Sequence, residues 1–250
     1  MKPNVLVIAG HDPSGGAGIH ADIEAIHALG GFASTLITAL TVQNTQAVRS
    51  FQLTPIELLK QQADCLLDDM TFSAVKIGMT GSVKVVEWIA ALLPRLGGIP
   101  VVLDPVLAAE SGGSLGEQDV PAALRRLFPQ VTLITPNLPE AQRLSGKMEL
   151  DAVGATLLAQ GASAALVTGT HDDTPEVQNH LFTEEGVSHA SWARLDGSFH
   201  GSGCTLASAI ACLLAQGLPL AEAVVKAQDY VHTSLAKAFR AGKGQWIPWR

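Results

Sequence analysis

Short apolar runs that alternate with longer amphipathic segments are the feature that most constrains the fold of this 250-residue chain. Near-continuous apolar runs are typical of strands buried on both faces of a sheet, and their alternation with helices predicts βαβ units. The predicted strands are residues 5–9, 33–40, 74–79, 101–103, 131–135 and 164–168. The predicted helices are residues 19–29, 55–69, 83–96, 120–127, 139–144 and 152–160. We therefore expect an α/β fold with one central, mostly parallel sheet between helices.

The pattern changes after residue 170. Residues 178–183 and 189–195 flank Glu185-Gly186, which predicts an antiparallel hairpin that covers an edge of the sheet. Two further helices are predicted at residues 204–216 and 220–239, separated by a Gly-Leu-Pro break. Because no low-complexity linker or internal repeat divides the chain, and 47% of its residues are hydrophobic, we expect residues 1–250 to form a single domain.

Charge and cysteine content exclude several classes of protein. The chain has 23 acidic and 16 basic residues and a net charge of -7, which argues against a nucleic-acid partner. No stretch is apolar for long enough to predict a signal peptide or a membrane span. Three cysteines without metal or redox spacing favour the reducing cytoplasm. Cys65 and Cys212, each within a helical apolar segment, are expected to be buried small hydrophobic residues.

The loop at residues 10–18 (GHDPSGGAG) joins the first predicted strand to a helix. In parallel sheets, ligands bind beyond the carboxyl ends of the strands, so such loops are the places to look for chemistry. The glycines of this loop permit a close approach of backbone to ligand, but the loop fits neither the Walker A motif nor the dinucleotide fingerprint. An ordinary strand-to-helix turn is an equally good interpretation of this loop taken alone.

Carboxylates follow two other predicted strands. Asp104 ends the strand at residues 101–103, and Glu140 lies three residues after Asn137. Two such carboxylates can hold Mg²⁺, usually through water molecules. The alternative is that Asn137 or Asp104 caps a helix and Glu140 closes a capping box, and the pattern alone favours capping.

Glycines surround a serine at residues 200–205 (HGSGCT), directly before a helix of small residues. The unpaired N–H groups at a helix start form a positive site suited to phosphate. The same field is expected to lower the pKa of the Cys204 thiol. A buried, inert cysteine is the alternative.

Six ordered motifs together resemble the ribokinase-like superfamily, and within it the hydroxymethylpyrimidine and phosphomethylpyrimidine kinases of thiamine synthesis. The matching segments span almost the whole chain. They are GHDPSGGAGI and AD at residues 10–19 and 21–22, TALTVQNT at 38–45, KIGM at 76–79, DPV at 104–106, TPNLPE at 135–140 and HGSGCT at 200–205. The resemblance implies a ribokinase-like three-layer fold, ATP and Mg²⁺ as cofactors, a small pyrimidine alcohol and its phosphate as acceptors, and a homodimer.

The resemblance also implies a role for each matching residue. Gln43 is expected to read the edge of the pyrimidine ring. The other residues expected in the acceptor pocket are Gly16, Asp22, Val42, Met79 and Val106. The residues expected at the nucleotide are Asn137, Thr168 and Gly169, with Asp104 and Glu140 holding the metal. The amides of Gly201, Ser202 and Gly203 are expected to form an anion hole, and Cys204 to be the base. A second phosphorylation is also implied, with Lys76 or nearby loop amides receiving the first phosphate.

The chain departs from the family pattern at the strand that ends with residues 165–167. Many family members continue with Lys-Gly-Gly-His, whereas this chain has Thr168-Gly169-Thr170-His171. Loss of the lysine, which contacts nucleotide phosphate in those relatives, affects the expected ATP affinity. His11 and His20 also replace commoner polar residues, and neither is given a catalytic role.

Three alternative functions remain open from the sequence. Pyridoxal kinases share the cysteine-containing anion hole and act on a similar hydroxymethyl group, but Gln43 and Val42 favour a pyrimidine. Residues 112–116 satisfy the G-x-S-x-G pattern of α/β hydrolases, although Ser114 does not directly follow a predicted strand. A ligand-binding protein without activity is conceivable because the lysine is absent, but Asp104 and Cys204 argue against it.

Overall fold

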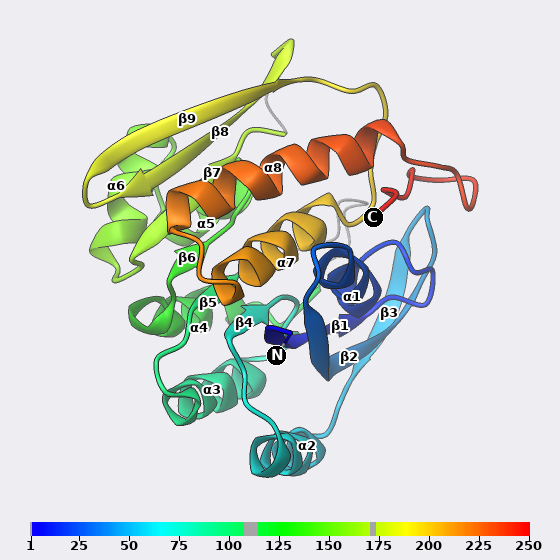
Figure 1. The fold of residues 1–250 in the computed structure, drawn as a ribbon, viewed down its shortest axis with the longest axis vertical. Coiled ribbons are helices and arrows are strands. Elements are labelled where there is room, and N and C mark those ends of the chain that lie inside the picture. The colour runs from blue at the N-terminus through cyan, green and yellow to red at the C-terminus, as the bar shows by residue number, and fades with distance from the viewer. Residues whose placement is uncertain (1, 108–114, 171–173) are drawn as a thin grey trace.

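A nine-stranded sheet forms the centre of the computed structural model, which describes residues 2–107, 115–170 and 174–250 (Figure 1). The strand order is β3-β2-β1-β4-β5-β6-β7-β8-β9. Neighbouring strands from β2 to β7 run parallel, whereas β3, β8 and β9 pair antiparallel. The strands are β1 (Asn4–His11), β2 (Phe32–Gln43), β3 (Val48–Leu53), β4 (Ala74–Ile77), β5 (Val101–Leu103), β6 (Leu133–Ile134), β7 (Ala164–Thr168), β8 (Glu176–Thr183) and β9 (Gly186–Ala193).

Helices cover both faces of the sheet, as Figure 1 shows. Alternate residues of β1 point to opposite faces, so that Val5 and Val7 pack in one cluster while Leu6 and Ile8 pack in the other. The first cluster includes α1 (Gly18–Ala28), α7 (Ser202–Ala215) and α8 (Leu220–Ala236). The second includes α2 (Ile56–Asp69), α3 (Val83–Leu92), α4 (Val120–Leu124), α5 (Leu138–Ser145) and α6 (Leu150–Ala159). The predicted three-layer α/β architecture is confirmed.

Several predicted elements differ in detail. β3 was not predicted, because its residues alternate weakly and none of them is buried. The predicted helix at 83–96 ends at Leu92 and continues as the 3-10 helix Leu93–Leu96, which carries a proline in its first turn. The helix predicted at 120–127 likewise ends early and continues as the 3-10 helix Arg125–Gln130. The predicted hairpin is present, but β9 begins three residues earlier than expected and the hairpin extends the sheet.

The three cysteines are all free, and they lie in different environments. Cys212 is buried, as predicted. The prediction for Cys65 is wrong: its side chain is exposed, because α2 buries only a narrow face that contains Leu59 and Ala63. No helix in the described residues combines the length and apolar character needed to cross a bilayer.

The C-terminal tail, which follows α8, lies against two loops that are far apart in the sequence. The Trp246 N–H donates to Ser198 O (2.9 Å), and the His200 N–H donates to Trp246 O (2.8 Å). The Gln245 N–H donates to Thr45 O at 2.9 Å, in the loop after β2. The tail therefore ties the loop before α7 to the loop between β2 and β3.

The two tryptophans of the tail pack against other residues of the same chain. Arg240 lies over the Trp246 ring, 5.0 Å from its centroid. Trp249 makes an edge-on contact with Phe239 at 5.7 Å between ring centroids, although 62% of Trp249 remains exposed.

Candidate active site

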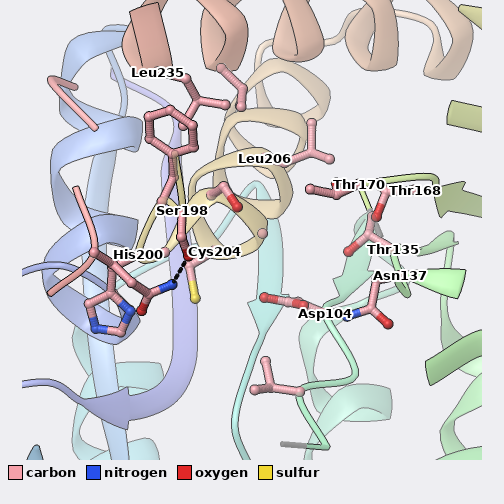
Figure 2. A pocket seen from close by; sticks show the side chains of 18 of the residues that line it. Asp104, Thr135, Asn137, Thr168, Thr170, Ser198, His200, Cys204, Leu206 and Leu235 are labelled. Carbon is pink, nitrogen blue, oxygen red and sulfur yellow. Dashed lines mark hydrogen bonds between the residues drawn. The ribbon is translucent and has the colours of Figure 1, made fainter. Parts of the chain in front are cut away.

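A cavity of about 550 Å³ lies at the carboxyl edge of the parallel strands, between the loop after β1, the loops after β4 to β7, and the start of α7. Most of the predicted site residues meet there. The predicted residues that line it are Gln43, Met79, Asp104, Val106, Asn137, Glu140, Thr168, Gly201, Ser202, Gly203 and Cys204. Figure 2 shows Cys204 and Asp104 on facing sides of this cavity, with Asn137 and Thr168 further along the side of Asp104.

Val42 does not line the cavity, contrary to expectation. Successive side chains of a strand point to opposite faces, so Gln43 and Thr41 face the cavity while Val42 points away and is 56% exposed. The Gln43 Nε2 donates to Thr41 Oγ1 at 2.7 Å, which fixes the orientation of the Gln43 amide.

Gly16 and Gly169 lie beside the cavity rather than on its wall. A side chain at Gly16 would collide with the ring of His200, so glycine allows the loop after β1 to pack against the loop before α7. The Gly169 N–H donates to Asn179 Oδ1 at 3.1 Å. In this structure both glycines shape the wall and do not contact the cavity directly.

Asp22 is fully buried and also does not line the cavity. Its Oδ1 accepts hydrogen bonds from Lys76 Nζ and from Ser208 Oγ, each at 2.7 Å. The Asp104 Oδ2 lies 3.9 Å from Lys76 Nζ. Burial alone would lower the pKa of Lys76, but the charges of Asp22, Cys204 and Asp104 outweigh it and raise that pKa. Asp22 therefore holds the Lys76 ammonium in place and has no contact with the cavity itself.

The predicted low pKa of Cys204 is wrong for the site as it stands. Burial raises the pKa of the Cys204 thiol to about 12, although the charge of Lys76 acts in the opposite direction. Loss of hydration outweighs the positive field of the helix start. Burial likewise raises the pKa of Asp104 to about 6, although the charge of Lys76 partly opposes this rise.

Asn137 and Glu140 form the capping box that the sequence favoured. The Glu140 N–H donates to Asn137 Oδ1 (2.9 Å), and the Asn137 N–H donates to Glu140 Oε2 (3.1 Å). The Leu107 N–H donates to Glu140 Oε1 at 3.3 Å. Within the described residues Asp104 caps no helix, and its buried Oδ2 has no hydrogen-bond partner. Mg²⁺ needs only one or two carboxylates, so the Asp104 oxygen would fit the ion, and Glu140, which interacts with the charge of Asp104, is a further carboxylate in the same cavity.

A pH dependence follows from the burial of Glu140. Burial and the charge of Asp104 raise the pKa of Glu140 from 4.5 to about 8. The folded state thus holds a proton that the unfolded state releases, so metal-free protein is expected to lose stability as the pH rises from 4.5 through 8. The free energy of unfolding, measured by urea denaturation at several pH values, should fall less with rising pH for Glu140→Gln than for the exposed control Glu185→Gln. An equal dependence on pH in the two variants would contradict the raised pKa of Glu140.

A second pair of residues at the site, buried Asp12 and partly buried His200, had no role predicted from the sequence. The His200 Nε2 lies 2.8 Å from Asp12 Oδ2, and the N–H groups of Ser14 and Ala17 donate to the same carboxylate at 2.8 and 2.9 Å. Burial alone would raise the pKa of Asp12, but the hydrogen bonds from His200 and Ser14 lower it to about 2. Both residues lie in quoted motifs, yet 188 positions separate them, and only the fold brings them together.

One wall of the cavity is apolar, and the sequence did not predict it. It comes from the hairpin, the loop before α7, and helices α7 and α8, and Figure 2 shows two of its members, Leu206 and Leu235. The wall consists of Val177, Trp192, Phe199, Leu206, Val231 and Leu235. These residues are far apart in sequence and carry no motif. A wall of this kind suits a planar aromatic group.

The chain matches the family described as phosphomethylpyrimidine kinase over residues 12–249. The chain belongs to the phosphomethylpyrimidine kinase family. It is 40% identical over 243 residues to a hydroxymethylpyrimidine/phosphomethylpyrimidine kinase of Escherichia coli, covering 94% of this chain and 91% of the relative.

Solved structures of similar proteins confirm the ribokinase-like fold. The phosphomethylpyrimidine kinase of Clostridium difficile superposes with a TM-score of 0.82 at 33% identity, covering 94% of this chain and all of that one (100%). The pyridoxal kinase of Staphylococcus aureus in complex with ADP superposes with a TM-score of 0.92 at 24% identity, covering 99% and 93% of the two chains. At 24% identity, the similarity to the pyridoxal kinase shows a shared fold and nothing more. The hydrolase motif cannot be placed, because residues 112–114 lie outside the described residues.

Proposed function

We propose that this kinase transfers the γ-phosphoryl group of ATP to the hydroxymethyl group of 4-amino-5-hydroxymethyl-2-methylpyrimidine and then phosphorylates the monophosphate. One observation carries the proposal: a single cavity holds Gln43 together with the loop of Gly201 to Cys204 at the start of α7. The family membership agrees with it.

The acceptor end of the cavity fits a small polar ring. Because Thr41 holds one N–H of the Gln43 amide, the other N–H and the carbonyl oxygen can pair with a ring nitrogen and an exocyclic amine. Met79 and Val106 supply apolar surface in the same cavity. A hydroxymethyl group carried by such a ring would point toward Cys204.

Phosphoryl transfer depends mainly on positioning and on stabilisation of charge. Gly201 adopts φ 79°, a left-handed conformation that glycine favours, and α7 begins at the next residue. We assign the amides of Gly201, Ser202 and Gly203 to the developing charge, and Asp104 with Glu140 to Mg²⁺. The ion, when bound, neutralises charge on the phosphate oxygens.

Cys204 is assigned to the proton of the substrate hydroxyl. Burial keeps its thiol protonated, and the Asp104 carboxylate is near enough to interact with it. We propose that sulfur accepts the hydroxyl proton while its own proton passes to Asp104. Sulfur then remains a thiol throughout, and the high pKa of Cys204 is no obstacle to the step.

The monophosphate acceptor requires room for one phosphate beside the ring. Lys76 lines the cavity, but its Nζ is committed to Asp22, so we assign the first phosphate to loop amides at the same edge. A homodimer remains part of this proposal because of the family resemblance, and a cytoplasmic location because the three cysteines are free.

Thr168, Gly169 and Asn137 are assigned to the nucleotide side, where this chain lacks the family lysine. Thr168 lines the cavity, so Thr168→Lys is expected to lower the KM for ATP about tenfold, the effect of one added charge-assisted hydrogen bond. Steady-state kinetics at saturating acceptor would measure this. Thr183→Lys, which adds the same charge outside the cavity, is the control. An unchanged KM in both variants would remove Thr168 from the nucleotide site.

The specificity is tested by comparing kcat/KM for the pyrimidine alcohol with kcat/KM for pyridoxal. We expect the pyrimidine to be the better acceptor. Faster phosphorylation of pyridoxal would overturn the assignment and favour vitamin B6 salvage. Absence of ADP release with either acceptor would favour a ligand-binding protein.

A further inference from the structure

Arg250 lies behind the loop that begins α7, on the side away from the cavity. Its side chain is completely buried, at 0% exposure. Its Nη1 pairs with Glu24 Oε2 at 3.0 Å, but 55% of the Glu24 side chain is exposed, so solvent screens that pair. The other nitrogens of Arg250 all point at the loops around the cavity.

Three hydrogen bonds connect this guanidinium to the site. The Arg250 Nε donates to Thr205 Oγ1 (2.7 Å), and the same hydroxyl donates to Gly201 O (2.7 Å). The Arg250 Nη2 donates to Gly16 O at 2.6 Å and to His200 O at 3.5 Å. A single planar group thus joins the glycine loop after β1 to the first turn of α7.

The packing at Gly201 shows how closely these parts meet. A side chain at Gly201 would collide with Gly16 O, would lie 2.9 Å from the Cα of Ala17, and would lie 2.9 Å from Arg250 Nη2. No space separates the two loops and the guanidinium. The guanidinium is therefore packed close to Gly201 and is linked to its carbonyl oxygen through the Thr205 hydroxyl.

We infer that Arg250 is a positioning residue for phosphoryl transfer: it fixes the helix-start amides against the glycine loop and adds a buried positive charge behind them. The inference rests on the proposed kinase function. The fork of N–H groups in arginine matches several acceptors at once, which the single ammonium of lysine does not. Because Arg250 does not line the cavity, its loss should affect the transition state more than substrate binding.

The test is a comparison of Arg250→Ala with Arg126→Ala. Arg126 is an exposed arginine with a carboxylate partner of its own, Glu87, at 2.9 Å, and lies outside the cavity. We expect Arg250→Ala to lower kcat by about 10²-fold, the effect of a displacement of roughly 1 Å, with KM changed by less than about threefold. Millimolar guanidinium should restore several-fold of the lost kcat, while ammonium should not. Arg250→Lys should recover only part of the rate.

A second readout does not depend on the kinase reaction. Inorganic phosphate should raise the thermal midpoint of the native protein and of Arg126→Ala, and should raise that of Arg250→Ala much less. If the native protein turned over no acceptor but phosphate still distinguished the variants in this way, the proposed function would fail while the role of Arg250 at the anion site would stand. Equal phosphate shifts in all three proteins, or a kcat of Arg250→Ala near that of the native enzyme, would overturn the inference. A uniform loss of folding without guanidinium rescue would also overturn it.

Discussion

Lys76→Met is expected to lower the free energy of unfolding by about 3–5 kcal/mol, the usual result of removing one partner from a buried ion pair. Lys76 and Asp22 are both completely buried and meet at 2.7 Å, and Asp104 lies 3.9 Å from the same ammonium. Methionine fills similar space but leaves two carboxylates without their cation. Urea denaturation at neutral pH would measure the loss.

Two variants make the interpretation specific. Lys60→Met breaks an exposed pair with Glu57, whose side chains are 48% and 72% exposed, and should change stability by less than about 1 kcal/mol. The double variant Asp22→Asn/Lys76→Met should lose less stability than the sum of its single changes, because the two residues are coupled. A loss below about 1 kcal/mol for Lys76→Met would show that the buried pair does not stabilise the fold.

Cys204→Ala is expected to lower kcat by about 10²–10⁴-fold, the usual contribution of a positioned acid or base. The loop amides, Asp104 and Gln43 remain in the variant, so the KM values should change little. The exposed Cys65 allows a matched control, since Cys65→Ala removes a thiol far from the cavity lining. Near-normal turnover of Cys204→Ala would refute the proton-transfer role and leave positioning as the main source of catalysis.

The sequence predicted the order of the elements well, because buried parallel strands such as β1 and β5 contain continuous apolar runs. It failed at β3, where no residue is buried and the strand is stabilised by antiparallel pairing with β2. It also placed the hairpin turn slightly late, since β9 is largely exposed and its periodicity is weak. In both cases antiparallel pairing with the preceding strand, and not burial of an apolar face, forms the strand, so a pattern of apolar residues does not define it.

The candidate site was predictable to the extent that it follows strand ends. Asp104 and Asn137 follow neighbouring strands, and they do reach one cavity. Burial was not predictable, and it reverses the expected pKa of Cys204 and hides Asp22 behind Lys76. Arg250 is the extreme case, because nothing in the local sequence indicates that the tail returns to the start of α7.

The most direct test of the proposed kinase activity is to identify the products formed from Mg-ATP and the pyrimidine alcohol, by phosphorus NMR and mass spectrometry. We predict that a pyrimidine monophosphate appears first and a diphosphate second, each with release of one equivalent of ADP. If no pyrimidine phosphate ester formed, while the same enzyme phosphorylated pyridoxal under the same conditions, the proposed activity would be contradicted.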